Sequence, residues 1–179
     1  MMQKKITLVA FGYFERIFLE KVVSAIEKEF SSDVRLIEGH LDLSVYYDIK
    51  RRQYNGDKLL EMMKERFDEN SGKTMGLFGV DLYIPILTHI FGQAYLNGDT
   101  GIASHFRLNN KLYGLEEDNQ LLLERFIKEI IHELGHTYGL IHCHTPTCVM
   151  RSSTYAEDID EKSRSFCDDC RQKIDRWPH

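Results

Sequence analysis

Three histidines and one glutamate stand at spacings that suit a metal ion. The stretch IIHELGHTYGLIHC contains the pattern H-E-x-x-H-x-x-G-x-x-H, formed by His132, Glu133, His136, Gly139 and His142. Residues four apart lie one turn apart on the same face of a helix, so His132 and His136 can bind one ion. Gly139 can end the helix in a left-handed conformation, and the returning chain would then bring His142 to that ion. Three neutral imidazoles leave a fourth position for water, which is the pattern of a catalytic zinc.

The glutamate of this pattern indicates the chemistry. Zinc lowers the pKa of a bound water from about 15.7 to about 7. Glu133, next to the first histidine, is then placed to act as the general base that takes the proton of that water. A plain amphipathic helix with incidental histidines is the competing interpretation, but it explains neither the glycine nor the third histidine at these spacings.

Four cysteines follow the histidines in the order C-x4-C and C-x2-C, namely Cys143, Cys148, Cys167 and Cys170. Four thiolates fit a closed tetrahedral zinc site, which stabilises the fold and leaves no position for substrate. Two disulfides or four unrelated thiols are the alternatives, and a mixed site that includes His144 is a further one. Neighbouring side chains of an extended segment point to opposite sides, so His142 and Cys143 can serve two different ions.

The elements that must position these residues can be read from the periodicity of apolar residues. A helix is predicted from Asp118 to Tyr138, capped at its start by Asp118 or Asn119. Further helices are predicted at residues 14–30 and 57–67, and strands at 5–10, from 33 onward, at 75–84, around 91–96 and at 101–104. Residues 46–55 are predicted to be a loop with solvated Arg51 and Arg52, and residues 151–166 a loop held by metal rather than by a core. This order favours an α+β fold, a mixed sheet with helices packed on it.

Composition bounds the class of protein. With 179 residues, 42% apolar and 28% charged, the chain is predicted to be one globular domain, residues 1–179. The net charge of −5 argues against nucleic acid or an anionic membrane as a partner. The first residues, MMQKKITLVAFGYF, are expected to form a buried strand and not a signal peptide, which implies a cytoplasmic protein.

The histidine motif, the cysteines interleaved after it and Met150 resemble those of the archaemetzincins, a branch of the metzincin zinc peptidases. The segments IFGQAYLNG and GIASHFRL resemble the family's strand pair before the active-site helix. The spacer from Met150 to Cys167 is one residue shorter than in the family pattern. The resemblance implies a twisted mixed sheet with the active-site helix in residues 1–139 and a smaller, zinc-stapled part in residues 140–179. It also implies a tight turn that places Met150 beneath the histidines as an apolar floor.

Three functions are consistent with these patterns. The first is a monomeric zinc peptidase with two zinc ions, in which, as the family resemblance implies, the edge strand at 91–96 binds an extended peptide antiparallel to itself. An aminopeptidase variant would need an acidic anchor for the free amine, and the sequence does not place Glu116, Glu117 or Gln93 there. Tyr155 and Arg151 are candidates for stabilising the oxyanion. The second is an inactive peptide-binding module on the same scaffold. The third is a zinc-ribbon adaptor, which the net charge and the acidic pair Asp168 and Asp169 disfavour near phosphate.

Overall fold

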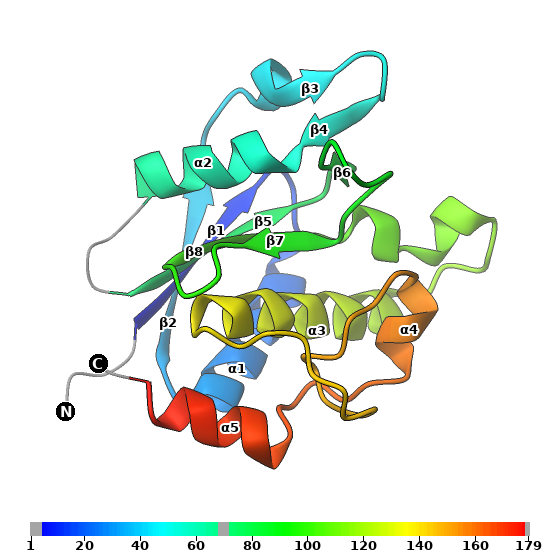
Figure 1. Ribbon diagram of the computed structural model, residues 1–179. Coiled ribbons are helices and arrows are strands. Elements are labelled where there is room, and N and C mark those ends of the chain that lie inside the picture. The colour runs from blue at the N-terminus through cyan, green and yellow to red at the C-terminus, as the bar shows by residue number, and fades with distance from the viewer. Residues whose placement is uncertain (1–4, 68–71, 178–179) are drawn as a thin grey trace.

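A five-stranded mixed sheet forms the centre of the computed structural model, which describes residues 5–67 and 72–177. Its strand order is β2-β1-β5-β8-β7, with β7 at one edge. Four strands are parallel and β7 alone runs antiparallel to its neighbour β8 (Figure 1). These strands are β1 (Lys5–Phe11), β2 (Asp33–Gly39), β5 (Lys73–Phe78), β7 (Gly92–Ala94) and β8 (Thr100–Ser104). The predicted mixed α/β architecture is confirmed.

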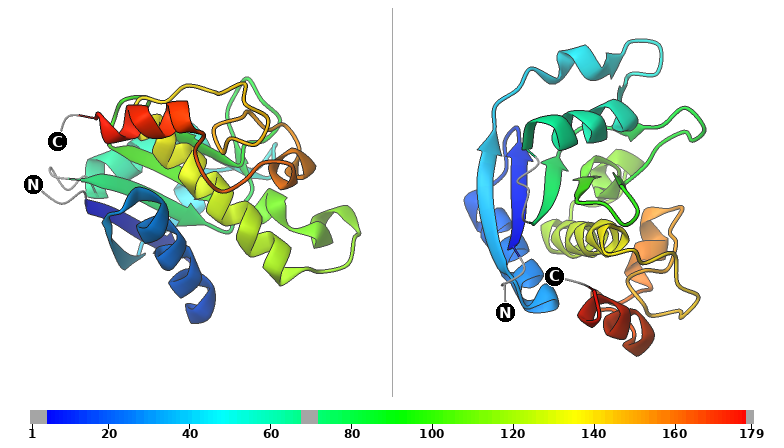
Figure 2. Two further views of the ribbon diagram at one scale, coloured as in Figure 1. Left: turned by 90° about the horizontal axis from the view of Figure 1, so that it is seen from below. Right: turned by 60° about the vertical axis from the view of Figure 1, so that its left-hand side comes forward.

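Helices cover both faces of this sheet. Helix α2 (Gly56–Phe67) contacts β5, β7 and β8 from one face, whereas α1 (Arg16–Phe30) and α3 (Asn119–Thr137) pack together on the other (Figures 1 and 2). Two apolar cores result. Val9, Leu59 and Phe78 belong to the core beneath α2, while the core around Ile26, Phe126 and Ile130 continues into the C-terminal segment. Since β1 and β5 are covered by helices on both faces, their sequences are nearly continuous apolar runs instead of alternating ones.

A second, small sheet lies beyond α2 and corrects two expectations. Residues 46–55 are not only a loop, because they contain β3 (Tyr47–Asp48) and β4 (Gln53–Asn55) after the short 3-10 helix η1 (Leu43–Tyr46). The expected strand at 75–84 is broken, because β5 ends at Phe78 and the chain turns to form β6 (Leu82–Tyr83), which joins β4 in the second sheet. A continuous apolar run does not reveal such a change of sheet.

The C-terminal segment is more ordered than a metal-held loop. It contains two helices that were not predicted from the sequence, α4 (Ala156–Asp160) and α5 (Asp168–Asp175). Two short 3-10 helices, η2 (Phe106–Leu108) and η3 (Asn110–Tyr113), precede α3 in the chain. Ile159 is fully buried, and Arg125 of α3 makes a two-pronged ion pair with Asp160 at 2.6 and 2.7 Å. The Glu29 carboxylate of α1 accepts the Phe166 N–H at 3.2 Å. Packing therefore holds this segment as well.

The buried Lys73 ties the end of α3 to the strands beneath it. Its ammonium donates to the carbonyls of Gly98 and Thr137, at 2.8 and 3.1 Å, and pairs with the Asp99 carboxylate at 2.7 Å. The ammonium also lies 5.0 Å from the Tyr138 ring centroid and 5.1 Å from that of Trp177. A single side chain thus joins β5, the turn between β7 and β8, and the end of α3.

Replacing Lys73 by Met should destabilise the protein by about 2–3 kcal/mol, because two carbonyls lose a buried donor and the cation–π contacts disappear. For a chain of this size that lowers Tm by about 4–12 °C, which thermal unfolding followed by circular dichroism would measure. Lys58→Met is the matched control, since Lys58 is exposed on α2. Equal melting temperatures for the two variants would contradict the role given to Lys73.

Candidate metal centre and cleft

Helix α3 places the first two histidines and the glutamate. The Asp118 side chain caps its start by accepting the Leu121 N–H at 2.8 Å, as predicted. The helix ends at Thr137, and Gly139 follows with a φ of +79°, the left-handed conformation expected of it. The N–H of Leu140 donates back to the Gly135 carbonyl at 3.1 Å, which reverses the chain and carries His142 toward the helix.

The three imidazoles converge. One ring nitrogen from each of His132, His136 and His142 lies within 4.8 Å of the others, and Nε2 of His132 is 3.1 Å from Nε2 of His136. Nδ1 of His132 donates to the Val149 carbonyl at 2.8 Å, and Nδ1 of His136 to the Leu140 carbonyl at 2.7 Å. A neutral ring that donates through Nδ1 carries its lone pair on Nε2, so two lone pairs face one another.

A cation fits between these nitrogens. At zinc–nitrogen bonds of about 2.0–2.1 Å, two ligands of a tetrahedral ion lie about 3.3–3.4 Å apart, close to the separation observed. Burial is the main cause that holds the pKa of His132 well below its usual value, and burial also lowers the pKa of His136 and His142. Burial thus favours the neutral form of the rings, which is the form that binds metal.

The four cysteines form a second, separate group. All four Sγ atoms lie within 4.8 Å of one another, and Sγ of Cys143 is 3.8 Å from Sγ of Cys167. That separation is far from the S–S bond of about 2.05 Å and equals the edge of about 3.8 Å expected between thiolates on a tetrahedral zinc with bonds of about 2.3 Å. The Thr145 N–H donates to the Cys143 sulfur at 3.4 Å. Against the effect of burial, hydrogen bonds with Thr145 and neighbouring thiols lower the pKa of Cys143 to about 7.

His142 and Cys143 belong to different groups, in line with the predicted opposite orientation of neighbouring side chains. The Cys143 N–H donates to the Met150 carbonyl at 2.9 Å, which fixes this dipeptide against the turn at residues 149–150. His144 is exposed and is a member of neither group. Met150 is fully buried, and an atom placed as a Cβ on Gly135 would stand 2.4 Å from its sulfur. The methionine therefore lies directly against α3 at Gly135, the residue before the second helical histidine.

Glu133 lies beside a second carboxyl group that was not predicted from the sequence. Glu129, one turn earlier on α3, is hydrogen-bonded to it through the side chains, and both are buried. Burial first, and then the Glu129 carboxyl, raise the pKa of Glu133 well above its usual value. The two carboxyls lie beneath Gly92 of β7, where an added Cβ would stand 2.7 Å from Cγ of Glu133. The spacing of Glu129 and Glu133 on one helix face was the only available signal.

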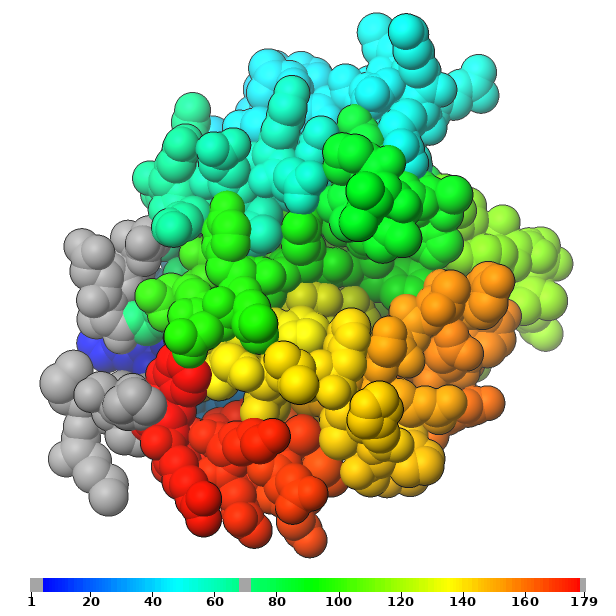
Figure 3. Space-filling view, in the orientation of Figure 1, coloured from blue at the N-terminus to red at the C-terminus, as the bar shows by residue number. Residues whose placement is uncertain are grey.

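These groups lie in a cleft of about 670 Å³ between strand β7 and the C-terminal segment. In Figure 3 the green residues above and the yellow and orange residues below form its two sides. Gln93 lines the cleft and donates to the Asp57 carboxylate at 2.8 Å, while Tyr155, Arg151, Glu116 and Glu117 are not among the lining residues. The other lining residues are Ile84, Leu87, Thr88, His89, Ile90, Phe91, Gly92, Ala94, Leu96, Glu129, His132, Glu133, His136, Ile141, His142, Ser152, Ser153, Thr154 and Lys162.

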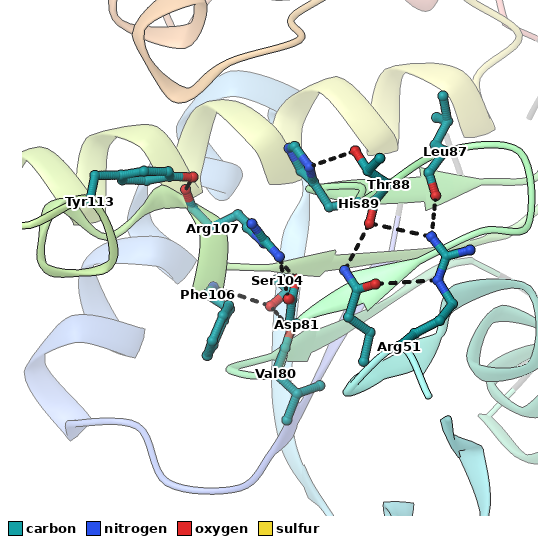
Figure 4. A network of polar contacts seen from close by, with 11 residues as sticks. Arg51, Val80, Asp81, Leu87, Thr88, His89, Ser104, Phe106, Arg107 and Tyr113 are labelled. Carbon is teal, nitrogen blue, oxygen red and sulfur yellow. Dashed lines mark hydrogen bonds and ion pairs between the residues drawn. The ribbon is translucent and has the colours of Figure 1, made fainter. Parts of the chain in front are cut away.

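The upper rim, residues 84–91, is held by a polar network (Figure 4). The Arg51 guanidinium donates to the Leu87 carbonyl at 2.7 Å and lies 4.1 Å from the centroid of the Tyr83 ring. Gln53 donates to the Thr88 carbonyl at 2.9 Å. Arg51 is therefore not merely solvated, contrary to the expectation from the sequence. Its acceptors lie 36 and 37 residues further along the chain, so no local sequence pattern indicates these contacts. On the same side, Arg107 pairs with Asp81 at 2.6 Å.

A helix bearing H-E-x-x-H, a third histidine brought back by a glycine turn, and a buried methionine packed against that helix are the features of a zinc metallopeptidase. Within the described residues, no helix has the length and apolar character needed to cross a bilayer. The chain belongs to peptidase family M54, whose family model matches residues 2–176.

Archaemetzincins are among the similar proteins. The Pyrococcus abyssi archaemetzincin is 37% identical over 163 residues, 89% of this chain and 86% of that protein. The Saccharolobus solfataricus archaemetzincin is 33% identical over 181 residues and covers 98% and 96%. The crystal structure of the Methanopyrus kandleri archaemetzincin superposes with a TM-score of 0.84 at 32% identity, covering 97% of this chain and 94% of that one. A zinc-dependent peptidase from Methanocorpusculum labreanum superposes with a TM-score of 0.82 at 27% identity, covering 94% and 99%. The family resemblance of the sequence is confirmed.

Proposed function

We propose that this protein hydrolyses peptide bonds at a zinc ion held by His132, His136 and His142, with Glu133 as the general base. The observation that carries this proposal is the pair of Nε2 atoms 3.1 Å apart, each on a ring whose Nδ1 is bonded to a backbone carbonyl. We further propose that residues 1–179 form one catalytic domain and act as a monomer in the cytoplasm, where free thiols are stable.

Zinc, when bound, polarises the scissile carbonyl and lowers the pKa of water. The protein supplies the remaining steps. The Glu133 carboxylate accepts a proton as water attacks the carbonyl carbon, and it then returns that proton to the nitrogen of the leaving amine. Val149 and Leu140, through their carbonyls, hold the two helical imidazoles in the orientation that exposes Nε2.

Strand β7 is proposed to bind the substrate. It stands at the edge of the five-stranded sheet, where no strand of residues 5–67 and 72–177 pairs with its outer side. Its residues Gly92, Gln93 and Ala94 line the cleft. An extended peptide can add to such an edge through backbone hydrogen bonds, antiparallel to β7, which would lay its backbone across the histidines.

The thiolates of Cys143, Cys148, Cys167 and Cys170 are proposed to hold a second, structural zinc. The site is closed, because the four Sγ atoms use all positions of a tetrahedral ion. It joins the segment that carries His142 to the start of α5, and so it holds the third catalytic ligand in place.

Whether the enzyme acts from a free N-terminus depends on an anchor for the amine. Among the candidates Glu116, Glu117 and Gln93, only Gln93 lines the cleft, and its side chain is a neutral amide. We therefore propose cleavage within a peptide as well as near its end. Acetylation of the N-terminus of a test peptide should then change kcat/KM for its cleavage by no more than a few-fold. An aminopeptidase would no longer cleave the acetylated peptide.

Metal removal tests the proposed function directly. The purified chain should contain two zinc ions by elemental analysis and cleave a mixed peptide library. A chelator that removes one ion should abolish cleavage, and stoichiometric zinc should restore it. A zinc-loaded protein that binds peptides without cutting any would instead be a peptide-binding module. The protein would be a zinc-ribbon adaptor if it held a single zinc ion and lost that ion only when one of the four cysteines was replaced.

A further inference from the structure

The lower wall of the cleft contains polar groups that peptide hydrolysis at the zinc does not use. Ser152, Ser153 and Thr154 form this wall together with Lys162. The wall is firmly held, because the Asp158 carboxylate accepts the backbone N–H of Thr154 at 2.8 Å and so fixes the chain at the start of α4. Helix α4 is in turn joined to α3, where the Lys128 ammonium donates to the Ile159 carbonyl at 3.0 Å.

The Ser153 hydroxyl is buried and has no hydrogen-bond partner among the described residues. A buried polar group without a partner costs about 1–3 kcal/mol, so such groups are uncommon and usually have an explanation. Ser153 lines the cleft, and a ligand in the cleft can therefore provide the missing partner.

Lys162 brings a positive charge to the same wall. The residue is 2% exposed, and its ammonium donates to the carbonyl of Arg151 at 2.8 Å, two residues before Ser153. This is the one hydrogen bond of the ammonium found within residues 5–67 and 72–177, so two of its three N–H groups remain for a ligand. The carboxyls of Glu129 and Glu133 face it from α3, yet neither forms an ion pair with it in that part of the chain.

The charges of the cleft floor favour an anion. With a zinc ion bound, the cleft would hold three positive charges, two from the ion and one from the Lys162 ammonium, against at most two negative charges from the carboxyls of Glu129 and Glu133. Three neutral imidazoles leave the two charges of a zinc ion uncompensated. A buried ammonium and a buried hydroxyl that both donate make charge-assisted hydrogen bonds with a carboxylate.

We propose that Lys162 and Ser153 form a subsite that binds a carboxylate of the substrate, next to the peptide bond that is cut. The carboxylate comes from an Asp or Glu side chain or from the C-terminus of a short peptide. This inference rests on the proposed function and adds the substrate class: peptides with an acidic group beside the scissile bond. The exposed apolar side chains Leu87 and Leu96 elsewhere along the cleft suit the neighbouring residues of such a peptide.

Cleavage of matched peptides tests the inference. One internally quenched peptide is made with Glu, Gln or Leu at each position flanking its cleavage site, and each version carries a free or an amidated C-terminus. With the zinc-loaded protein, kcat/KM should be at least about tenfold higher for Glu than for Gln at one position. Dependence on a free C-terminus in short peptides, without dependence on Glu, would assign the carboxylate to the terminus.

Variants connect that preference to the two residues. Lys162→Met should bring the ratio of kcat/KM for Glu over Gln close to one, Lys162→Arg should keep most of it, and Ser153→Ala should lower it several-fold. Lys58→Met, on the exposed face of α2, should leave the ratio unchanged. The subsite is overturned if the wild type cleaves the Glu and Gln peptides, and also the free and amidated peptides, with equal kcat/KM. It is likewise overturned if the ratio of kcat/KM for Glu over Gln is unchanged in Lys162→Met.

A binding measurement separates this inference from the proposed function. Two hydroxamate inhibitors, one with a succinyl side chain and one with the corresponding amide, are titrated calorimetrically into the zinc-loaded protein. The acid should bind at least about tenfold more tightly than the amide, and Lys162→Met should remove the difference. If no peptide is cleaved yet the acid is preferred, the proposed function fails and the subsite stands. If peptides are cleaved and both inhibitors bind alike, the subsite fails alone.

Discussion

Glu133→Gln should lower kcat for peptide cleavage by about 10²- to 10⁴-fold, the range that general base catalysis contributes. The amide has nearly the same shape, so it keeps the packing beneath Gly92, but it cannot accept the proton of the attacking water. Zinc content should stay at the wild-type value, because Glu133 is not among the converging nitrogen and sulfur ligands. Steady-state kinetics and elemental analysis of the same preparation would measure both.

The matched control for this substitution is Glu116→Gln. Glu116 is an exposed carboxylate outside the cleft, so its replacement should leave both kcat and zinc content unchanged. Wild-type turnover in Glu133→Gln would show that another group takes the proton, and Glu129, hydrogen-bonded to Glu133, would become the first candidate.

Cys170→Ser should have the largest effect on stability. A serine hydroxyl is a poor replacement for a thiolate on zinc, and loss of a structural metal is among the few changes that destabilise a protein by more than about 4 kcal/mol. Tm should fall by at least about 8 °C. Since Cys143 adjoins His142, peptide cleavage should fall as well, although Cys170 is no part of the cleft.

Zinc counts separate the two sites. His136→Ala should lose one of two ions and all activity while Tm changes little, because the thiolate site stays intact. Cys170→Ser should lose the other ion and destabilise the protein. His144→Ala, beside the cysteines but in neither group, should retain both ions and the wild-type Tm. Retention of two ions in Cys170→Ser would refute a closed site of four thiolates.

The metal ligands could be predicted from the sequence because their positions follow from local geometry. His132 and His136 depend only on the pitch of a helix, and His142 on one glycine that reverses the chain. The long apolar strands and the amphipathic helices were also predictable, since burial imposes a period on the residue types. The structure confirms their existence, with boundaries within two residues of those predicted except at the strand expected at 75–84, which ends at Phe78.

The groups that the sequence did not reveal depend on distant partners. Lys162 faces the carboxyls of Glu129 and Glu133 on α3, and Arg51 donates to a carbonyl 36 residues further along the chain. Helix α4 has only five residues, too few for an apolar period, and is stabilised by packing on α3 and by the ion pair with Arg125. Such features arise where segments meet in three dimensions, and a single sequence carries no local trace of them.

The imidazoles of His132 and His136 are oriented by main-chain carbonyls, those of Val149 and Leu140, rather than by carboxylates. Alanine scanning would therefore reveal the role of the two histidines but not that of Val149 and Leu140, because replacing either side chain leaves the main-chain carbonyl in place. The residues at positions 140 and 149 can therefore change during evolution while the orientation of the two imidazoles is kept. Only an insertion, a deletion or an ester replacing the peptide link could disturb it.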